Sequence, residues 1–272
     1  MRILPSIVFA ASVAAGASSA FADSILYVDD SNGDLAKVDA DTGSVTNIGN
    51  TGVVLTDIAL NSSGAMYGIS FSNLYSINIT TAATTKIGSF GSGIDDLNAL
   101  VFGSNGTLYS AGYDDTKIYT LNTSTGTATA LTGSTGVDSA GDLAFNPDGS
   151  GNLYESDSNG ALVKVSLGPP VSGTVVGSFN VSNGDEMYGM ATGTDGVLYG
   201  LADSDIYSIN TSTGKATYLS NFSDPTHNFC QGSAYAYGAT APWPSAPVPE
   251  PTTLGLMAMG GMMLLAKRRK KA

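Results

Sequence analysis

The stretch DIALNSSGAMYGISFSNLYSIN, residues 57 to 78, contains the unit that recurs through this chain. The short apolar segment DIAL ends in the polar turn NSSG, and MYGIS follows at once. Two extended segments joined by a short, Gly-closed turn predict a β-hairpin. The next segment, NLYSIN, alternates large apolar residues with polar ones, as a half-buried strand does. The stretch therefore predicts three consecutive strands.

The same arrangement recurs along the chain. Leu-Tyr or Met-Tyr pairs follow one another at steps of 40, 42, 45 and 45 residues, and their tyrosines are Tyr27, Tyr67, Tyr109, Tyr154 and Tyr199. Each pair precedes an alternating segment (DLAKVD, NLYSIN, KIYTLN, ALVKVS, DIYSIN) and then a third segment such as SVTNIG or KATYLS. In three units a Gly-closed turn, ADTG or TSTG, separates these two segments. Four short strands in about 40–45 residues are typical of one β-propeller blade.

The two ends of the repeat predict a closed ring. The first unit begins at its Leu-Tyr strand, residues 25 to 29, and lacks the strand that precedes it in the other units. The segment GSAYAYG, residues 232 to 238, matches this missing innermost strand and has no Leu-Tyr strand after it. We therefore expect an all-β propeller of five four-stranded blades, in which the last strand completes the N-terminal blade. A β-sandwich and an open β-solenoid with the same strand density are the alternatives.

One position in the innermost strands carries a small residue in each unit. Ala59, Val101, Ala144 and Ala191 are equivalent in the repeat. A small side chain at this position would fit a strand that is crowded near a central axis.

The sequence divides into four segments. Residues 1–22 have a positive start at Arg2, an apolar middle and the small-x-small sequence Ala20-Phe21-Ala22, which together predict a signal peptide cut by signal peptidase after Ala22. Residues 23–238 form the repeat body, which is long enough for a full hydrophobic core. Residues 239–248 form a Pro-rich linker, and residues 249–272 form a C-terminal sorting and anchor segment.

The charge of the body excludes one class of partner. Between residues 23 and 238 the chain has five lysines against 22 acidic residues, a net charge of −17, because the other basic residues lie in the leader and the tail. Such a body repels phosphate backbones, so we expect no nucleic-acid partner. It would attract divalent cations, and Ca²⁺ is the cation its carboxylates could coordinate. Cys230 is the only cysteine, so no disulfide holds the body together.

The body lacks a recognisable catalytic set. It has one histidine and one cysteine, His227 and Cys230, and no Ser-His-Asp arrangement, nucleophile elbow or phosphate-binding loop. Carboxylates are plentiful, and Asp57, Asp142 and Glu186 are expected at one mouth of the central channel. These could bind a cation or sugar hydroxyls, or act as acid and base. Alternatively, the aspartates only cap turns and keep an edge soluble.

The C-terminal segment has three parts in a fixed order. Pro249-Glu250-Pro251 precedes fifteen uncharged residues, 252 to 266, and the basic cluster Lys267, Arg268, Arg269, Lys270 and Lys271 follows at once. As a single hydrophobic helix the apolar run would span about 22 Å, less than the bilayer core of about 30 Å. The basic cluster would stay in the cytoplasm. We therefore expect a transient tether to the inner membrane rather than a permanent anchor.

This tail resembles the PEP-CTERM protein-sorting domain. The resemblance implies an envelope of the Gram-negative type and an exosortase that recognises Pro249-Glu250-Pro251 and removes the tail. It also implies a Ser/Thr/Asn/Gly-rich surface protein linked to exopolysaccharide production. The repeat body is similar to other secreted bacterial propellers only in a general way.

Together these features predict an exported, non-enzymatic propeller that is processed at its tail and displayed at the surface or released into the extracellular matrix. There it would bind polysaccharide or envelope proteins. The alternatives are a secreted propeller enzyme, a lyase or glycan hydrolase that uses Asp57, Asp142 and Glu186, and a periplasmic module whose tail is never cut.

Overall fold

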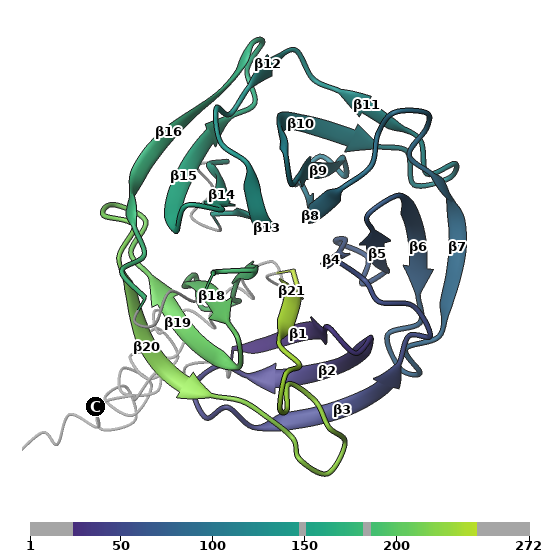
Figure 1. The fold of residues 1–272 in the computed structure, drawn as a ribbon, viewed down its shortest axis with the longest axis vertical. Coiled ribbons are helices and arrows are strands. Elements are labelled where there is room, and N and C mark those ends of the chain that lie inside the picture. The colour runs from purple at the N-terminus through teal and green to yellow at the C-terminus, as the bar shows by residue number, and fades with distance from the viewer. Residues whose placement is uncertain (1–23, 147–150, 182–185, 244–272) are drawn as a thin grey trace, which may run out of the picture.

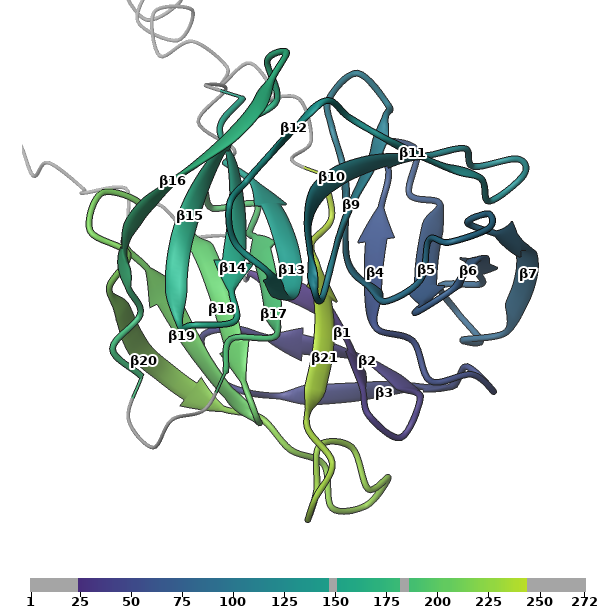
Figure 2. The same ribbon diagram turned by 45° about the horizontal axis from the view of Figure 1, so that its top comes forward.

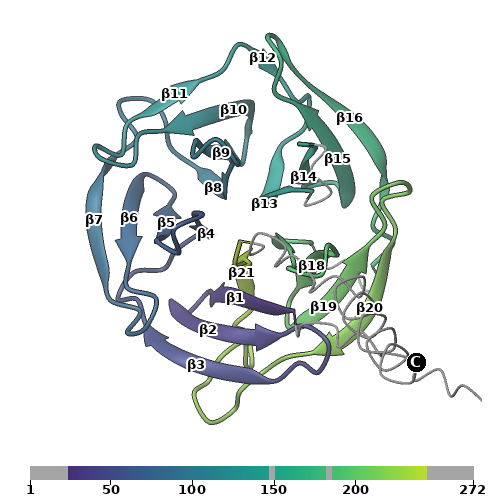
Figure 3. The ribbon, with the colours of Figure 1, turned by 180° about the vertical axis from the view of Figure 1, so that it is seen from behind.

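The computed structural model describes residues 24–146, 151–181 and 186–243. Within these ranges the chain forms five small antiparallel sheets arranged in a ring around one axis (Figure 1), and the view from behind shows the same ring (Figure 3). The expected signal cleavage site, sorting motif, basic cluster and C-terminal helix all lie outside the described residues.

The sheets are numbered here as blades in chain order. Blade 1 contains β1 (Ile25–Asp30), β2 (Asp34–Asp39), β3 (Val45–Asn50) and β21 (Ala236–Thr240). Blade 2 contains β4 (Asp57–Leu60), β5 (Met66–Ser70), β6 (Asn73–Ile77) and β7 (Thr84–Ser89). Blade 3 contains β8 (Leu97–Phe102), β9 (Leu108–Gly112), β10 (Asp115–Leu121) and β11 (Ala128–Ala130).

The last two blades follow the same plan. Blade 4 contains β13 (Ser139–Phe145), β14 (Leu153–Asp157), β15 (Ala161–Ser166), β16 (Val171–Ser178) and the short β12 (Gly133–Ser134). Blade 5 contains β17 (Gly189–Thr192), β18 (Leu198–Ala202), β19 (Asp205–Ile209) and β20 (Ala216–Asn221). The five-bladed all-β propeller predicted from the repeat is therefore confirmed.

The ring closes as the repeat ends predicted. The C-terminal strand β21 pairs antiparallel with β1, with Val28 opposite Ala239, and so supplies the innermost strand of blade 1. Figure 2 shows β21 beside β1 and β2, the first strands of the chain. The body ends later than expected, because β21 continues to Thr240, opposite Tyr27. The boundary placed at residue 238 lies inside this strand.

One blade differs from the expected four strands. The segment TATALTG was expected to form a single outer strand of blade 3, but it contributes β11 to that blade and β12 to blade 4. There β12 pairs in parallel with β16, and Val171 N donates a hydrogen bond of 2.7 Å to the Thr132 carbonyl. Gly133 permits this approach, because a Cβ at that residue would lie 2.4 Å from the Val171 backbone.

Burial falls from the axis to the rim. The innermost strand β4 is buried throughout, whereas the outer strands β3 and β7 have no fully buried residue. The apolar core is divided into five clusters, and each draws its side chains from two adjacent blades. For example, Leu35 of blade 1 packs with Ile58 and Met66 of blade 2. Each blade is therefore stabilised by stacking on its neighbours, as the sequence pattern required.

The turns rich in Thr, Ser and Gly connect the blades at the rim. The turn of blade 3 lies on the outer strand of blade 2, where a Cβ on Gly88 would meet the Thr125 carbonyl oxygen at 2.0 Å. The same contact recurs between blades 4 and 5, where a Cβ on Gly177 would lie 2.1 Å from the Thr213 carbonyl. Beside the first contact, Ala128 N donates a hydrogen bond of 2.8 Å to the Phe90 carbonyl.

This contact makes Gly88 sensitive to substitution. We expect Gly88→Ala to lower the free energy of unfolding by about 1–3 kcal/mol, because the added methyl group forces the blade 3 turn away from β7. Gly168→Ala is the matched control, since its Cβ would approach nothing nearer than the Ser166 Oγ at 3.6 Å. Urea unfolding of the two variants and the unsubstituted chain measures the difference, and equal midpoints for both variants would contradict the role of the turn.

Candidate functional site

The five innermost strands bring one equivalent residue each to the axis of the ring. In the repeat alignment these residues share one position, and they are Asp57, Ala99, Asp142, Gly189 and Gly238. Two are acidic and three are very small. A Cβ on Gly238 would lie 2.3 Å from Asp57 Oδ1 and 2.8 Å from Asp29 Oδ1, so the position opposite a carboxyl group has no room for a side chain.

The two axial aspartates bind the backbone of all five innermost strands. Such strands have an edge that faces the axis, and its N–H groups have no partner strand. The Asp57 carboxylate accepts from two of these N–H groups and the Asp142 carboxylate accepts from three. The donors are Ile58 and Leu100 for Asp57, and Leu143, Met190 and Ala239 for Asp142. These five donors lie on β4, β8, β13, β17 and β21, one on each strand.

Burial changes the protonation of this pair. Both carboxyl groups are inaccessible to solvent. Burial raises the pKa of Asp57 and of Asp142 well above the ordinary range, and the charges of Asp142 and Asp29 raise that of Asp57 further. A side-chain hydrogen bond joins Asp57 to Asp142. Two carboxylates cannot hydrogen-bond to each other without a proton, so we expect the pair to share one, with Asp142, which has three N–H donors, as the better anion.

Two further carboxyl groups are buried, Asp29 on β1 and Glu155 on β14. Burial raises the pKa of Asp29 well above its usual value, and it raises the pKa of Glu155 to about 8. For these groups folding favours the protonated form, relative to the unfolded chain.

The structure separates the three carboxylates expected at one mouth. Asp57 and Asp142 come together, but inside the ring rather than at an opening. Glu186 is exposed on the loop before β17, and Asp95 and Asp96 are exposed before β8. The reason is the alignment position: Asp57 and Asp142 lie within the innermost strands, where neighbouring blades cover them. Among residues 24–146, 151–181 and 186–243, no group of three or more His, Cys, Asp or Glu is placed to hold a metal ion.

Three tyrosines gather at the end of the channel where the innermost strands begin. Tyr188 and Tyr237 each precede the axial residue of their strand, and Tyr235 lies two residues before Tyr237. The ring centroids of Tyr188 and Tyr235 are 5.3 Å apart, and those of Tyr235 and Tyr237 are 5.1 Å apart. All three are half-buried. A side-chain hydrogen bond links Tyr188 to Glu186. We call these four residues the tyrosine surface.

The phenol groups of Tyr188 and Tyr237 remain donors at neutral pH. Burial and the adjoining Glu186 raise the pKa of Tyr188, and burial raises that of Tyr237 to about 12. The hydroxyl groups of Tyr235 and Tyr237 are 3.2 Å apart. At the same level of the channel, Asn98 Oδ1 and Ser139 Oγ are buried and have no hydrogen-bond partner within the part of the chain that the structure describes.

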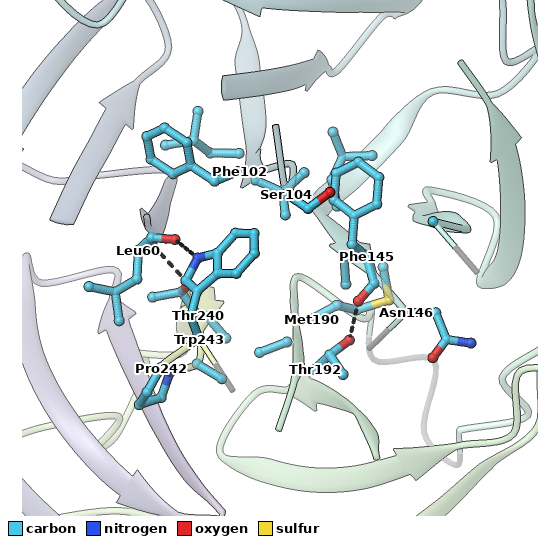
Figure 4. A pocket seen from close by; sticks show the side chains of 18 residues that line it. Leu60, Phe102, Ser104, Phe145, Asn146, Met190, Thr192, Thr240, Pro242 and Trp243 are labelled. Atoms are coloured by element: carbon cyan, nitrogen blue, oxygen red, sulfur yellow. Dashed lines mark hydrogen bonds between the residues drawn. The ribbon is translucent and has the colours of Figure 1, made fainter. Parts of the chain in front are cut away.

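A pocket of about 320 Å³ opens at the opposite end of the channel, where the innermost strands end (Figure 4). Its lining includes four of the residues whose N–H groups bind the aspartates, which are Leu100, Leu143, Met190 and Ala239. The pocket is therefore separated from the tyrosine surface by the layer of axial carboxyl groups. The side chains at its opening are mostly aromatic or aliphatic.

Sequence reasoning missed both ends of the channel. Tyr27, Tyr75 and Tyr119 are buried in packing between blades, and Tyr207 is partly buried against the cluster between blades 4 and 5. Tyr188 and Tyr237 occupy the position before the axial residue in two units only, so the repeat pattern did not mark them. The repeat alignment did contain a sign of the axial position, because only Asp, Ala or Gly occurs there: Asp57, Ala99, Asp142, Gly189 and Gly238. The small residues expected to be crowded at the axis, Val101 and Ala191 among them, instead line the pocket.

Residues 247–270 match the PEP-CTERM protein-sorting motif, which confirms the resemblance noted for the tail. The chain thus combines a five-bladed β-propeller with a PEP-CTERM sorting motif. The motif implies exosortase as the processing partner, export, and a membrane-anchored precursor that leads to the cell surface. In the described part of the chain there is no helix with the length and hydrophobicity needed to cross a membrane.

Comparison with solved structures shows the fold. A structure from work on the de novo evolutionary emergence of a symmetrical protein is 20% identical, with a TM-score of 0.50 over 82% of this chain and 100% of that one. A protein of unknown function from Bacteroides thetaiotaomicron is 18% identical, with a TM-score of 0.50 over 73% of this chain and 58% of that one. A putative gluconolactonase is 16% identical, with a TM-score of 0.48 over 75% and 80%. Comparison with curated protein sequences finds no match.

The two axial aspartates should respond differently to substitution. Asp142→Ala leaves three buried N–H groups without an acceptor, at about 1–3 kcal/mol for each, so a large loss of stability is expected. Asp57→Asn keeps an oxygen for only one of Ile58 and Leu100, because their N–H groups donate to Oδ1 and Oδ2 of Asp57, and it offers Asp142 an amide donor. It should therefore cost less than Asp142→Ala, about 1–3 kcal/mol for the one N–H group left without an acceptor. The exposed Asp41→Asn serves as the control.

The pH dependence gives a second readout of the same pair. Because the native pKa values are raised, the folded chain holds protons that the unfolded chain releases above pH of about 4. Stability should fall as the pH rises from 5 to 8, and Asp57→Asn should reduce that fall. Urea unfolding at both pH values measures it, and an unchanged pH dependence in Asp57→Asn would show that the pair does not share a proton.

Proposed function

We propose that this chain is an exported, exosortase-processed binding protein without enzymatic activity, and that its tyrosine surface binds uncharged polysaccharide at the cell surface or in the extracellular matrix. The observation that carries the proposal is the cluster of three half-buried tyrosines with Glu186 at the channel end. Aromatic faces pack against the apolar C–H faces of sugar rings, while phenol and carboxylate groups bond to sugar hydroxyl groups.

The charge of the body supports an uncharged partner. The body has a net charge of −17, so an anionic polymer would be repelled at low ionic strength. Phe71 and Tyr113 are 46% and 51% exposed and lie where β8 begins, on the same face as the tyrosine surface. The Phe71 carbonyl accepts from Leu97 N, at the start of β8, and Tyr113 N donates to the Asp96 carbonyl just before it. This face therefore offers several aromatic rings to an extended chain of sugars.

The placement of the carboxylates also supports a non-enzymatic role. An acid and a base that act on a glycan must reach the bond that is cleaved. Asp57 and Asp142 are buried, and their oxygens are engaged by backbone N–H groups of all five innermost strands. Of the three carboxylates considered for catalysis, Glu186 alone is exposed.

The tyrosine surface can be tested by glycan binding. We expect the purified chain to bind the producer's exopolysaccharide or a neutral glycan from a panel, and Tyr188→Ala and Tyr235→Ala to weaken binding by about tenfold or more, as loss of a central aromatic contact does. Tyr218→Ala is the matched control, because Tyr218 is 53% exposed on β20 at the rim. Isothermal titration calorimetry measures the affinities. Absence of binding to every glycan, or equal loss in Tyr218→Ala, would contradict the proposal. If the chain cleaves a glycan, and Asp142→Asn abolishes this cleavage without unfolding the chain, the alternative of a secreted propeller enzyme is favoured.

Processing of the tail can be tested by mass spectrometry of the chain isolated from the producing cells. We expect the mature chain to begin after Ala22 and to lack Lys271, because signal peptidase and exosortase act at the two ends. Glu250→Ala should leave the tail in place, because it removes the only charge of the sequence Pro249-Glu250-Pro251. Ser245→Ala, four residues before this sequence, should not. Recovery of Lys271 in the mature unsubstituted chain would refute removal of the tail.

A further inference from the structure

The pocket at the exit end of the channel lies where the described chain ends. After β21, Ala241, Pro242 and Trp243 continue along the pocket and form part of its lining. The Trp243 indole Nε1–H donates a hydrogen bond of 2.7 Å to the Leu60 carbonyl, which fixes the ring at the pocket. Figure 4 shows this indole with Leu60 on one side and Phe145 on the other. The described part of the chain therefore ends at the pocket itself.

The lining selects an uncharged and mostly apolar occupant. Leu60, Phe102, Phe145, Met190 and Trp243 supply most of the large side chains, and no charged residue is among the lining residues that the structure describes. The polar groups are largely engaged within the chain. The Thr192 hydroxyl donates to the Phe145 carbonyl at 2.6 Å, and the Thr240 hydroxyl accepts from Leu60 N at 3.1 Å. A strongly polar ligand would leave its own groups without partners here.

The next residues of the chain have the chemistry that this lining selects. Pro244, Ser245, Ala246, Pro247 and Val248 carry no charge, and four of the five are apolar. Pro-rich segments favour the extended polyproline II conformation and dock into aromatic-lined grooves at a low entropic cost. Five residues in that conformation span about 15 Å. A segment tethered at the pocket edge also has an effective concentration in the millimolar range, so weak contacts suffice to hold it.

We propose that the exit-end pocket is the docking site for the chain's own segment 244–248. Docking places Pro249-Glu250-Pro251 directly at the exit face of the propeller, so exosortase meets the sorting motif next to the folded body and not at the end of a free spacer. After cleavage at the motif, segment 244–248 remains as the new C-terminus and stays in the pocket. The tyrosine surface at the other end of the channel is left open.

Trp243 provides a direct reporter, because it is the only tryptophan of the chain. In the purified full-length chain, docking should shield the indole. The double substitution Pro247→Ser and Val248→Ser should shift its fluorescence to longer wavelength and raise its quenching by acrylamide several-fold. Val175→Ser is the matched control, since Val175 is 59% exposed on β16 away from the pocket. Unchanged emission and quenching in the double variant would overturn the proposal.

Two added ligands, a peptide and a dye, distinguish segment 244–248 from other occupants of the pocket. The synthetic peptide PSAPV, capped at both ends, should reverse the spectral change in the double variant at millimolar concentration and leave the unsubstituted chain unaffected. The apolar dye anilinonaphthalene sulfonate should bind the double variant and not the unsubstituted chain. Binding of the dye or of a fatty acid to the unsubstituted chain with a change in Trp243 emission would show an open pocket and would overturn the proposal. Neither measurement depends on glycan binding at the tyrosine surface.

Discussion

The ring depends on how it satisfies the backbone at its centre. Five innermost strands converge on one axis, and each carries an edge whose N–H groups have no partner strand. Asp57 and Asp142 supply the acceptors, and together they bind one N–H group from every blade. The carboxyl groups thus connect the blades at the axis, in addition to packing, rim contacts and side-chain hydrogen bonds such as Thr192 to the Phe145 carbonyl. Burial raises the pKa values of both carboxyl groups well above the ordinary range.

The same layer divides the channel into two chemically different ends. On one side, three half-buried tyrosines and the Glu186 carboxylate form a surface with several hydrogen-bonding groups. On the other side, the pocket is apolar and its polar groups are mostly engaged within the chain. The described chain ends at the apolar end, at Trp243.

Stability without disulfides follows from the repeated interfaces. The chain has one cysteine, Cys230, which is buried. Five apolar clusters, one at each junction between blades, take the place of a single central core. At the rim, glycines such as Gly88 and Gly177 let the turn of the next blade approach the outer strand closely. The closure of β21 on β1 ties the two ends of the body together, so that no blade is left with an unstacked face.

The sequence by itself determined the blade plan, the number of blades, the closure and the sorting tail. These follow from local alternation, from a period of about 40–45 residues and from three motifs in a fixed order, all of which can be seen along one dimension. The tertiary structure alone decided what the carboxylates do. Asp57 and Asp142 are 85 residues apart in the chain, and only ring closure brings them together and buries them, whereas Glu186 stays exposed. It likewise decided that Tyr188, Tyr235 and Tyr237 meet, because they come from strands of blades 5 and 1 that become neighbours only when the ring is closed.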